Sequence, residues 1–236
     1  MALFFMNVRN VAKAKQSAVA KASYVSGEKL FSDRDEEMKS FRTREVSPDS
    51  FILAPSHAPE WVYNRETLWN EAERVEVPVN ARVMREVVVA LPIELTDEQQ
   101  KELLVEYVQE NFVDAGMVAD VNIHKDREQN PHAHILLTVR PFQENGEWAK
   151  QKTKKEYILD ANGDFVFNKK GNKKARMVDL TGWQGKEKIV EWRKNLAEKI
   201  NEYYQKHGIE ESVSHLSYAD QGLDKQAIER LTRGEY

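Results

Sequence analysis

The stretches "MVADVNIH" (117–124) and "NPHAHILLTVRP" (130–141) decide the fold of this chain. Each contains an apolar run of the kind found in β-strands. Only seven residues, "KDREQNP" (125–131), join the two runs, and so short a link favours antiparallel pairing. Strands and helices are mixed along the rest of the chain. We therefore expect an α+β fold, with a central antiparallel β-sheet flanked by helices in a single domain over 1–236.

Three histidines lie at related positions of these two strands. Side chains alternate along a strand, so His132 and His134 share one face. A symmetric hairpin places His124 opposite His132 and Asn122 opposite His134, with opposed Cβ atoms about 4.5–5.5 Å apart. All three imidazoles would then reach one metal ion at about 2.0–2.2 Å and leave coordination positions open. The alternative is that they are unrelated, partly buried histidines.

The remaining segments carry local signals for helices and strands. Ser17 is a suitable N-cap and Gly27 a stop for a first helix, and Thr96 with Gln99 forms a capping box. Asn162-Gly163 lies between apolar runs and indicates a hairpin turn. We expect strands at 2–8 and 84–92, helices at 17–27, 64–76, 95–116 and 183–207, a loop at 31–50, a lysine-rich β-hairpin insertion around 150–178 and a helical C-terminal part at 181–236.

Composition excludes several classes of protein. The chain has no cysteine, which excludes thiolate metal sites, disulfides and cysteine nucleophiles. No apolar run approaches the roughly 20 residues of a membrane helix, so we expect a cytoplasmic protein without a membrane segment. The net charge of −4 argues mildly against nucleic acid, yet basic residues gather in the first 30 residues and in 150–176. These runs form either a local basic surface or simply solvated loops.

Three histidines do not choose the reaction by themselves. They suit a zinc hydrolase, in which the metal activates water, and they equally suit phosphoryl transfer. The second reaction needs a nucleophile, and the candidate is Tyr24 on the first predicted helix, near the face of Ala20 and Lys21. Considered alone, a tyrosine at such a position is usually a half-buried packing residue.

Several motifs together resemble one family. The stretches "QSAVAKASYVSGEKL", "ILAPSHAPEW", "LWNEAE", "REVVVALP", "GMVADVNIH" and "NPHAHILLTVRP" occur in the order seen in the MobA/MobL (MobQ-type) plasmid mobilisation relaxases. The resemblance covers about residues 3 to 222. It implies a relaxase fold of the histidine-hydrophobe-histidine endonuclease superfamily, with a tyrosine on an N-terminal helix. Such enzymes nick one DNA strand at a plasmid origin of transfer and stay attached to its 5′ end.

The resemblance also implies roles for individual residues. Tyr24 matches the nucleophile, and His124, His132 and His134 match the metal ligands. Glu86 matches an acidic strand position, as a base or a partner of a ligand; the alternative is a solvated residue beside Arg85. We expect DNA contacts at Lys21, Lys29, Lys125, Arg140, Lys154, Lys155, Lys173 and Lys174, with base stacking on exposed aromatics such as Trp148.

The implied cofactor is a divalent metal ion, Mn or Mg first and Zn, Ni or Co as alternatives. The implied partners are single-stranded or hairpin DNA of the origin of transfer, relaxosome accessory proteins and a coupling protein, in a bacterial cytoplasm. The chain departs from the family pattern at Val25 and Leu216, where arginine is common, and it lacks the usual His-Leu-Gly ending.

Three other functions remain open at this point. A replication initiator of the same superfamily has similar chemistry, but its tyrosine follows the histidine pair, whereas Tyr24 precedes it. A histidine-triad nucleotide hydrolase would use a histidine of "HAHILL" without metal, yet position 136 is Leu where a further histidine is needed. The third alternative is a DNA-binding module without catalysis.

Overall fold

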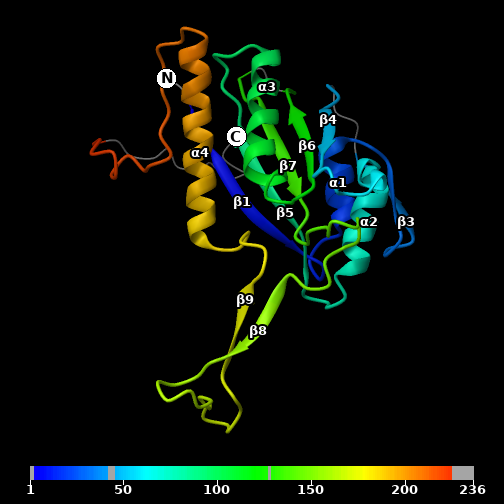
Figure 1. Cartoon of the computed structure of the whole chain (residues 1–236). Coiled ribbons are helices and arrows are strands. Elements are labelled where there is room, and N and C mark those ends of the chain that lie inside the picture. The colour runs from blue at the N-terminus through cyan, green and yellow to red at the C-terminus, as the bar shows by residue number, and fades with distance from the viewer. Residues whose placement is uncertain (1–2, 42–45, 127–128, 225–236) are drawn as a thin grey trace, which may run out of the picture.

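A central sheet of five antiparallel strands organises the computed structural model, which describes residues 3–41, 46–126 and 129–224 (Figure 1). In spatial order the strands are β1 (Met6–Ala12), β5 (Arg82–Ala90), β7 (His132–Leu137), β6 (Ala119–His124) and β4 (Asp49–Leu53). Every neighbouring pair is antiparallel. The expected α+β class with an antiparallel sheet flanked by helices is confirmed.

One face of the sheet packs against α3 (Asp97–Val108), the π-helical turn η2 (Gln109–Val113) and α4 (Lys186–Lys206) (Figure 1). Side chains alternate along a strand, and the odd-numbered residues of the three central strands point to this face. Apart from Val83, which packs in the other core cluster, and the charged Arg85, they are apolar and form one core cluster with the helices, which includes Val87, Val89, Val121, Ile123, Ala133 and Ile135.

The opposite face is covered only in part, by α1 (Ala18–Ser26) and α2 (Arg65–Val75). Here the even-numbered residues begin as core, with Met84 and Leu136 under the two helices. Further along the same strands the residues become polar, and this polar half holds all three histidines. The change of character along one face marks where the sheet stops being packed core and becomes a site.

Local capping signals set the ends of the helices as predicted. The Ser17 hydroxyl accepts a hydrogen bond from the Ala20 amide, and Gly27 ends α1 with φ of +77°, a left-handed conformation that suits glycine. The capping box of Thr96 and Gln99 is present at α3. Asn64 caps α2 through the Thr67 amide.

Several boundaries differ from the sequence prediction. The first strand is Met6–Ala12 rather than 2–8. Residue 2 of the predicted strand lies outside the described residues. The segment 31–50, predicted as loop, contains the hairpin of β2 (Leu30–Ser32) and β3 (Glu37–Lys39) and the start of β4. The two strands of this hairpin have only three residues each, too few to show an alternating pattern in the sequence. A 3₁₀ turn, η1 (Glu60–Tyr63), precedes α2.

A two-stranded arm projects from the body (Figure 1). Its strands, β8 (Thr153–Tyr157) and β9 (Ala175–Asp179), pair antiparallel. Beyond them the chain makes two tight turns, closed by the bridges Leu159–Phe165 and Phe167–Lys173. The first turn contains Gly163 at φ of +87°, as its Asn-Gly sequence predicted.

After α4 the chain folds back beside the helix without further helix through residue 224. The amide side chain of Asn201 exchanges two hydrogen bonds with the backbone of Val213. The part predicted as helical, 181–236, is therefore helical only over α4 within its described portion, and 225–236 lie outside the described residues. Among the helices that the structure describes, none is long and apolar enough to cross a membrane.

Candidate metal centre and tyrosine pocket

The β6–β7 hairpin brings the three histidines together in the predicted register. His124 pairs with His132, and Asn122 pairs with His134. The three ring centroids lie 4.7 to 5.3 Å apart. One nitrogen from each ring lies within 4.8 Å of the others, a spacing that permits coordination of a single ion.

Hydrogen bonds orient each imidazole. His124 Nε2 lies 2.7 Å from the carbonyl oxygen of Val25, and His132 Nδ1 lies 2.8 Å from that of Asn130. His134 Nδ1 lies 2.6 Å from the Glu86 carboxylate. Because carbonyl and ionised carboxylate oxygens only accept, each of these nitrogens carries the ring proton. The opposite nitrogen of each ring then offers a lone pair, so the donor set fits a divalent cation.

Val25 also connects the metal centre to the first helix. Its carbonyl, one residue after Tyr24, accepts the His124 proton, so α1 and β6 are joined directly at the site. This contact leaves His124 Nδ1 as the nitrogen that could hold a metal ion, whereas His132 and His134 would use Nε2.

Glu86 is fully buried behind His134. Its carboxylate accepts hydrogen bonds from His134 (2.6 Å) and the Lys21 ammonium (2.7 Å), and it also contacts the Arg9 guanidinium. Burial opposes ionisation, but these donors outweigh it and lower the pKa of Glu86 to about 2. The alternative of a solvated strand residue is wrong. Its neighbour Arg85 points to the other face and donates to the Trp183 carbonyl.

Burial also affects His134. It raises the pKa of an acid such as Glu86 but lowers that of a base such as histidine. Desolvation lowers the pKa of the His134 imidazole and outweighs the opposing effect of the Glu86 carboxylate. The ring is thus held in its neutral form, which is the form that binds metals.

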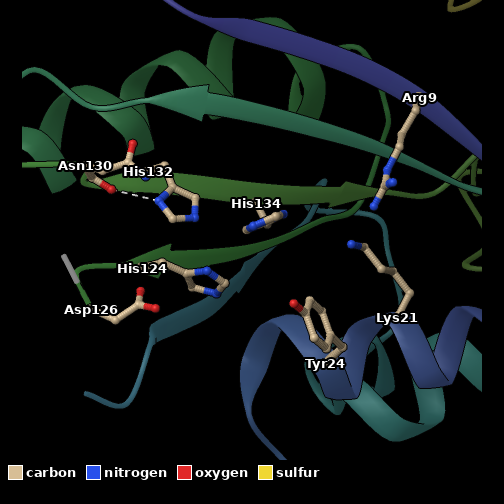
Figure 2. A pocket seen from close by; sticks show the side chains of 8 residues that line it. All are labelled: Arg9, Lys21, Tyr24, His124, Asp126, Asn130, His132 and His134. Carbon is tan, nitrogen blue, oxygen red and sulfur yellow. Dashed lines mark hydrogen bonds between the residues drawn. The ribbon is translucent and has the colours of Figure 1, made fainter. Parts of the chain in front are cut away.

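Tyr24 faces the histidines across a pocket of about 400 Å³ (Figure 2). The neighbouring residues of α1 are buried, but Tyr24 is 47% exposed, and its hydroxyl points toward the histidine cluster. The Lys21 ammonium lies 5.4 Å from the centre of its ring. A tyrosine hydroxyl and a candidate metal centre therefore share one cavity.

Three residues of this pocket were not predicted: Arg9, Asp126 and Asn130. Arg9 is paired with Glu86 in the β1–β5 register, so its place depends on contacts between distant parts of the sequence. Asp126 follows His124 by two residues, and a strand continued past His124 would have placed it on the same face. Asn130 takes part through its backbone carbonyl, which accepts from His132, and a pattern of side chains cannot predict such a contact.

Beneath the pocket, a buried ion pair joins α2 to β6. The Arg65 guanidinium donates to both carboxylate oxygens of Asp120, at 2.9 to 3.1 Å, and also pairs with Glu28 at the end of α1. Trp69 Nε1 donates to the same carboxylate at 2.9 Å. Asp120 lies four residues before His124 on β6. This network therefore holds both helices to the strand that carries the first histidine.

The predicted DNA contacts divide into two sets, one around the pocket and one on the arm, with Arg140 apart from both. Lys21 is buried against Glu86 in the pocket wall, and Lys125 pairs with Asp97, while Lys29 is exposed. Lys154, Lys155, Lys173 and Lys174 are exposed on the arm. Arg140 belongs to neither set.

Arg140 and Trp148 are less exposed than the sequence suggested, because each has partners within the chain. Arg140 is bound by Glu76 at 2.9 Å and by the carbonyl of Ala149 at 2.7 Å. The Trp148 ring stacks on Phe142 with centroids 4.0 Å apart. Both side chains hold the base of the arm to the body, a role that local sequence does not distinguish from surface exposure.

Charge and aromatic side chains gather on the arm. Residues 150–176 contain nine lysines and arginines against three acidic residues, although the whole chain has a net charge of −4. The rings of Tyr157 and Phe165 are 5.6 Å apart, and the Lys173 ammonium lies 3.5 Å from the centre of the Phe165 ring. This combination of cations and exposed rings is typical of nucleic-acid surfaces.

Comparison with known proteins gives consistent results. Residues 16–233 match the model of the MobA/MobL family. The chain is 32% identical to the probable mobilization protein MobA of Bifidobacterium longum over 95% of its own length, and 29% identical to the conjugal transfer protein TraA of Agrobacterium fabrum over 93%. It spans only 42% and 20% of these two relatives, respectively.

A solved structure described as "Molecular Basis of Vancomycin Resistance Transfer in Staphylococcus aureus" has the same fold. The two chains are 31% identical and superpose with a TM-score of 0.75. The match covers 92% of the present chain and 100% of that chain.

Proposed function

The chain belongs to the MobA/MobL family, and on this premise we propose that it is a relaxase, which nicks and reseals one DNA strand at a plasmid origin of transfer. The observation that carries the proposal is the shared pocket of Tyr24 and the three histidines. In the proposal residues 1–236 form one nicking domain, and the arm at 150–178 is an insertion in it.

The proposed reaction is a transesterification. The Tyr24 oxygen attacks the scissile phosphorus, the bond from phosphorus to the 3′ oxygen breaks, and a 5′-phosphotyrosine forms. The phenol proton is lost to solvent, and the leaving oxygen gains a proton to become a 3′-OH. One phosphodiester replaces another of similar energy, so the same 3′-OH can reverse the step and reseal the strand.

The three imidazoles supply the binding site for the cofactor. A divalent cation held there would polarise a nonbridging oxygen of the scissile phosphate and stabilise its developing charge. Of the expected metals, Zn, Ni and Co suit three imidazole nitrogens better than Mn and Mg, which prefer oxygen ligands.

We assign Glu86 the role of a positioning residue rather than a base. Its carboxylate is occupied by cationic and imidazole donors, and a pKa of about 2 makes it a weak proton acceptor. It holds the His134 ring by Nδ1 and keeps Lys21 and Arg9 at the pocket wall. The two cations would then face the phosphate from the side opposite His132.

The arm supplies the second part of the DNA surface in this proposal. Its lysines would contact backbone phosphates of single-stranded or hairpin DNA, and its exposed rings would stack on bases. Accessory proteins of a relaxosome and a coupling protein would join the chain on this DNA.

A covalent adduct tests the proposal. The substrates are labelled single-stranded oligonucleotides that tile the DNA on either side of the coding region, with Mn²⁺ present. We expect wild type to form a protein–DNA adduct that survives denaturing gels, and Tyr24→Phe to form none. Tyr63→Phe is the matched control, because Tyr63 is similarly exposed but lies outside the pocket.

Three outcomes would contradict the proposal. An undiminished adduct in Tyr24→Phe removes the assigned nucleophile. Cleavage that persists in chelator without any adduct would instead favour a histidine-triad hydrolase, while binding without cleavage across all tiles would favour a DNA-binding module.

A further inference from the structure

The residue next to the proposed nucleophile in space is Phe41, which follows the strand β3. The Phe41 and Tyr24 rings pack edge to face, with centroids 5.4 Å apart and an angle of 89° between their planes. Both rings are about half exposed, at 45% and 47%. Phe41 therefore does not belong to the core, and its ring contact is directed at the tyrosine.

A buried serine keeps the two segments together. Ser23 is fully buried on α1, and its hydroxyl oxygen lies 2.6 Å from the Glu28 carbonyl and 3.0 Å from the Lys39 carbonyl. The single hydroxyl proton is shared between these two acceptors. Because Ser23 adjoins Tyr24 and Lys39 lies two residues before Phe41, this contact joins the backbones of the two segments next to the ring pair.

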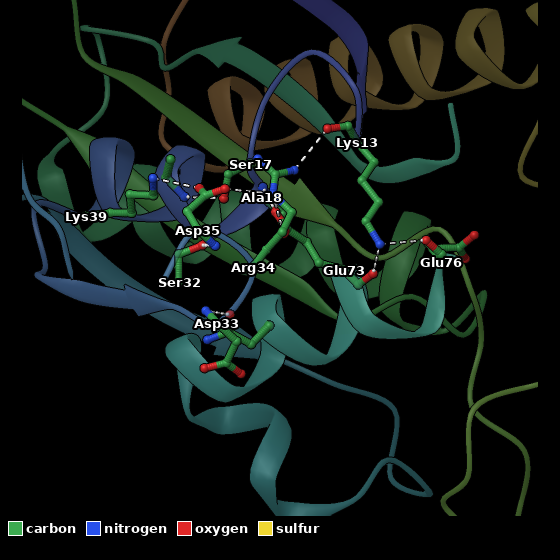
Figure 3. Close-up of polar contacts among 12 residues, drawn as sticks. Lys13, Ser17, Ala18, Ser32, Asp33, Arg34, Asp35, Lys39, Glu73 and Glu76 are labelled. Atoms are coloured by element: carbon green, nitrogen blue, oxygen red, sulfur yellow. Dashed lines mark hydrogen bonds and ion pairs between the residues drawn. The ribbon is translucent and has the colours of Figure 1, made fainter. Parts of the chain in front are cut away.

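The hairpin that carries Phe41 is itself anchored to the tyrosine helix (Figure 3). Arg34 lies in the turn between β2 and β3. Its guanidinium donates to the Lys13 carbonyl at 2.9 Å and lies 3.5 Å from the Glu73 carboxylate. Glu73 in turn accepts from the Ala18 amide at the start of α1. The hairpin is thus bound at the beginning of α1 through Arg34 and in its middle through Ser23.

We propose that Phe41 is a positioning residue for Tyr24. Its ring blocks rotation of the tyrosine away from the histidines, so that the phenol is already directed at the metal centre before DNA binds. This inference rests on the proposed function for its catalytic meaning, but not for the contact itself. Misplacement of a reacting group by about 1 Å can cost up to about a hundredfold in rate, so even a loosened ring is expected to matter.

A spectroscopic experiment without DNA tests the positioning directly. 3-Fluorotyrosine is incorporated at position 24, and its ¹⁹F resonance is recorded in the full chain. We expect Phe41→Ala to narrow the resonance and shift it toward that of the free amino acid, and Phe41→Tyr to restore it. Phe31→Ala is the matched control, since Phe31 is an exposed phenylalanine of the same hairpin. An unchanged resonance in Phe41→Ala overturns the proposal.

Single-turnover kinetics then test the consequence. With an oligonucleotide that forms the Tyr24 adduct, at saturating concentration, we expect Phe41→Ala to react about tenfold more slowly, with a Kd within twofold of wild type and full rescue by Phe41→Tyr. Ser23→Ala should slow the reaction in the same direction. A weakened Kd with an unchanged rate at saturation would overturn the proposal and make Phe41 a DNA contact.

The two proposals fail differently. If wild type forms no adduct with any tile, the relaxase function fails, while the fluorine spectra still decide whether Phe41 positions Tyr24. Thermal unfolding of each variant within a few degrees of wild type confirms that the fold is retained.

Discussion

The two faces of the central sheet carry opposite kinds of residues on the same strands. The odd-numbered positions of β6 and β7, together with Val87 and Val89 of β5, are apolar and packed under α3 and α4. Even-numbered positions include Glu86, Asp120 and the three histidines, all buried or half-buried. Because side chains alternate along these strands, the same strands carry a packed apolar face and, opposite it, a polar face that lines the pocket.

The difference shows how polar groups are tolerated inside a fold. A buried carboxylate is destabilising unless it is paired. The two buried carboxylates of the polar face both have partners: Asp120 pairs with Arg65, and Glu86 pairs with Lys21, Arg9 and His134. The Asp120 pair joins helices to the sheet, whereas the Glu86 set orients the pocket. We therefore expect the first to control stability and the second to control metal binding.

Removing Asp120 should have the largest effect on stability. Asp120→Ala leaves the Arg65 guanidinium buried without its main partner, and we expect the free energy of unfolding to fall by about 3–5 kcal/mol. Urea unfolding followed by circular dichroism measures this. Asp49→Ala removes an exposed aspartate that pairs with Lys101 at the edge of the same sheet and should cost at most about 1 kcal/mol. Equal losses in both variants would show that the network adds nothing.

A cavity on the apolar face should separate stability from chemistry. Ile135→Ala, on β7 directly between His134 and Leu136 in sequence, should lower the free energy of unfolding by about 2–5 kcal/mol. Its side chain points away from the pocket, so Mn²⁺ affinity by titration calorimetry should stay within about threefold of wild type, below the loss expected for an oriented ligand. A tenfold loss of affinity would mean that the two faces are not independent.

Changing Glu86 should produce the converse result. Glu86→Gln keeps the shape of the side chain but removes the charge that orients His134, and we expect about 10- to 100-fold weaker Mn²⁺ binding. Glu76→Gln is the matched control, because Glu76 is also a buried carboxylate with two cationic partners, Arg140 and Lys152, outside the pocket. Equal losses of Mn²⁺ affinity in both variants would refute a specific role for Glu86.

Sequence reasoning succeeded where the information was local. The register of the β6–β7 hairpin and the Ser17 and Thr96 caps follow from spacing, short loops and side-chain periodicity. The clustering of the three histidines could be predicted for this reason, since two strands joined by a short loop contain all three.

It failed where distant segments meet. Arg9 reaches the pocket only because β1 pairs with β5, and Phe41 reaches Tyr24 only because a polar segment folds into a hairpin. Arg140 and Trp148 are less exposed than expected for the related reason that exposure depends on what the rest of the chain covers.

The arm lies outside both faces, so its variants should change neither stability nor metal affinity. Replacing Lys154, Lys155, Lys173 and Lys174 with Ala should weaken single-stranded DNA binding, with the smallest effect at high salt. The slope of log affinity against log salt should fall by about 0.7 for each phosphate that a lysine no longer neutralises. Fluorescence anisotropy over a salt series measures this slope. The control removes four lysines of α4, Lys186, Lys188, Lys194 and Lys206, and so makes the same change in net charge away from the arm. Equal changes of slope in both variants would mean that overall charge, rather than the arm, determines binding to DNA.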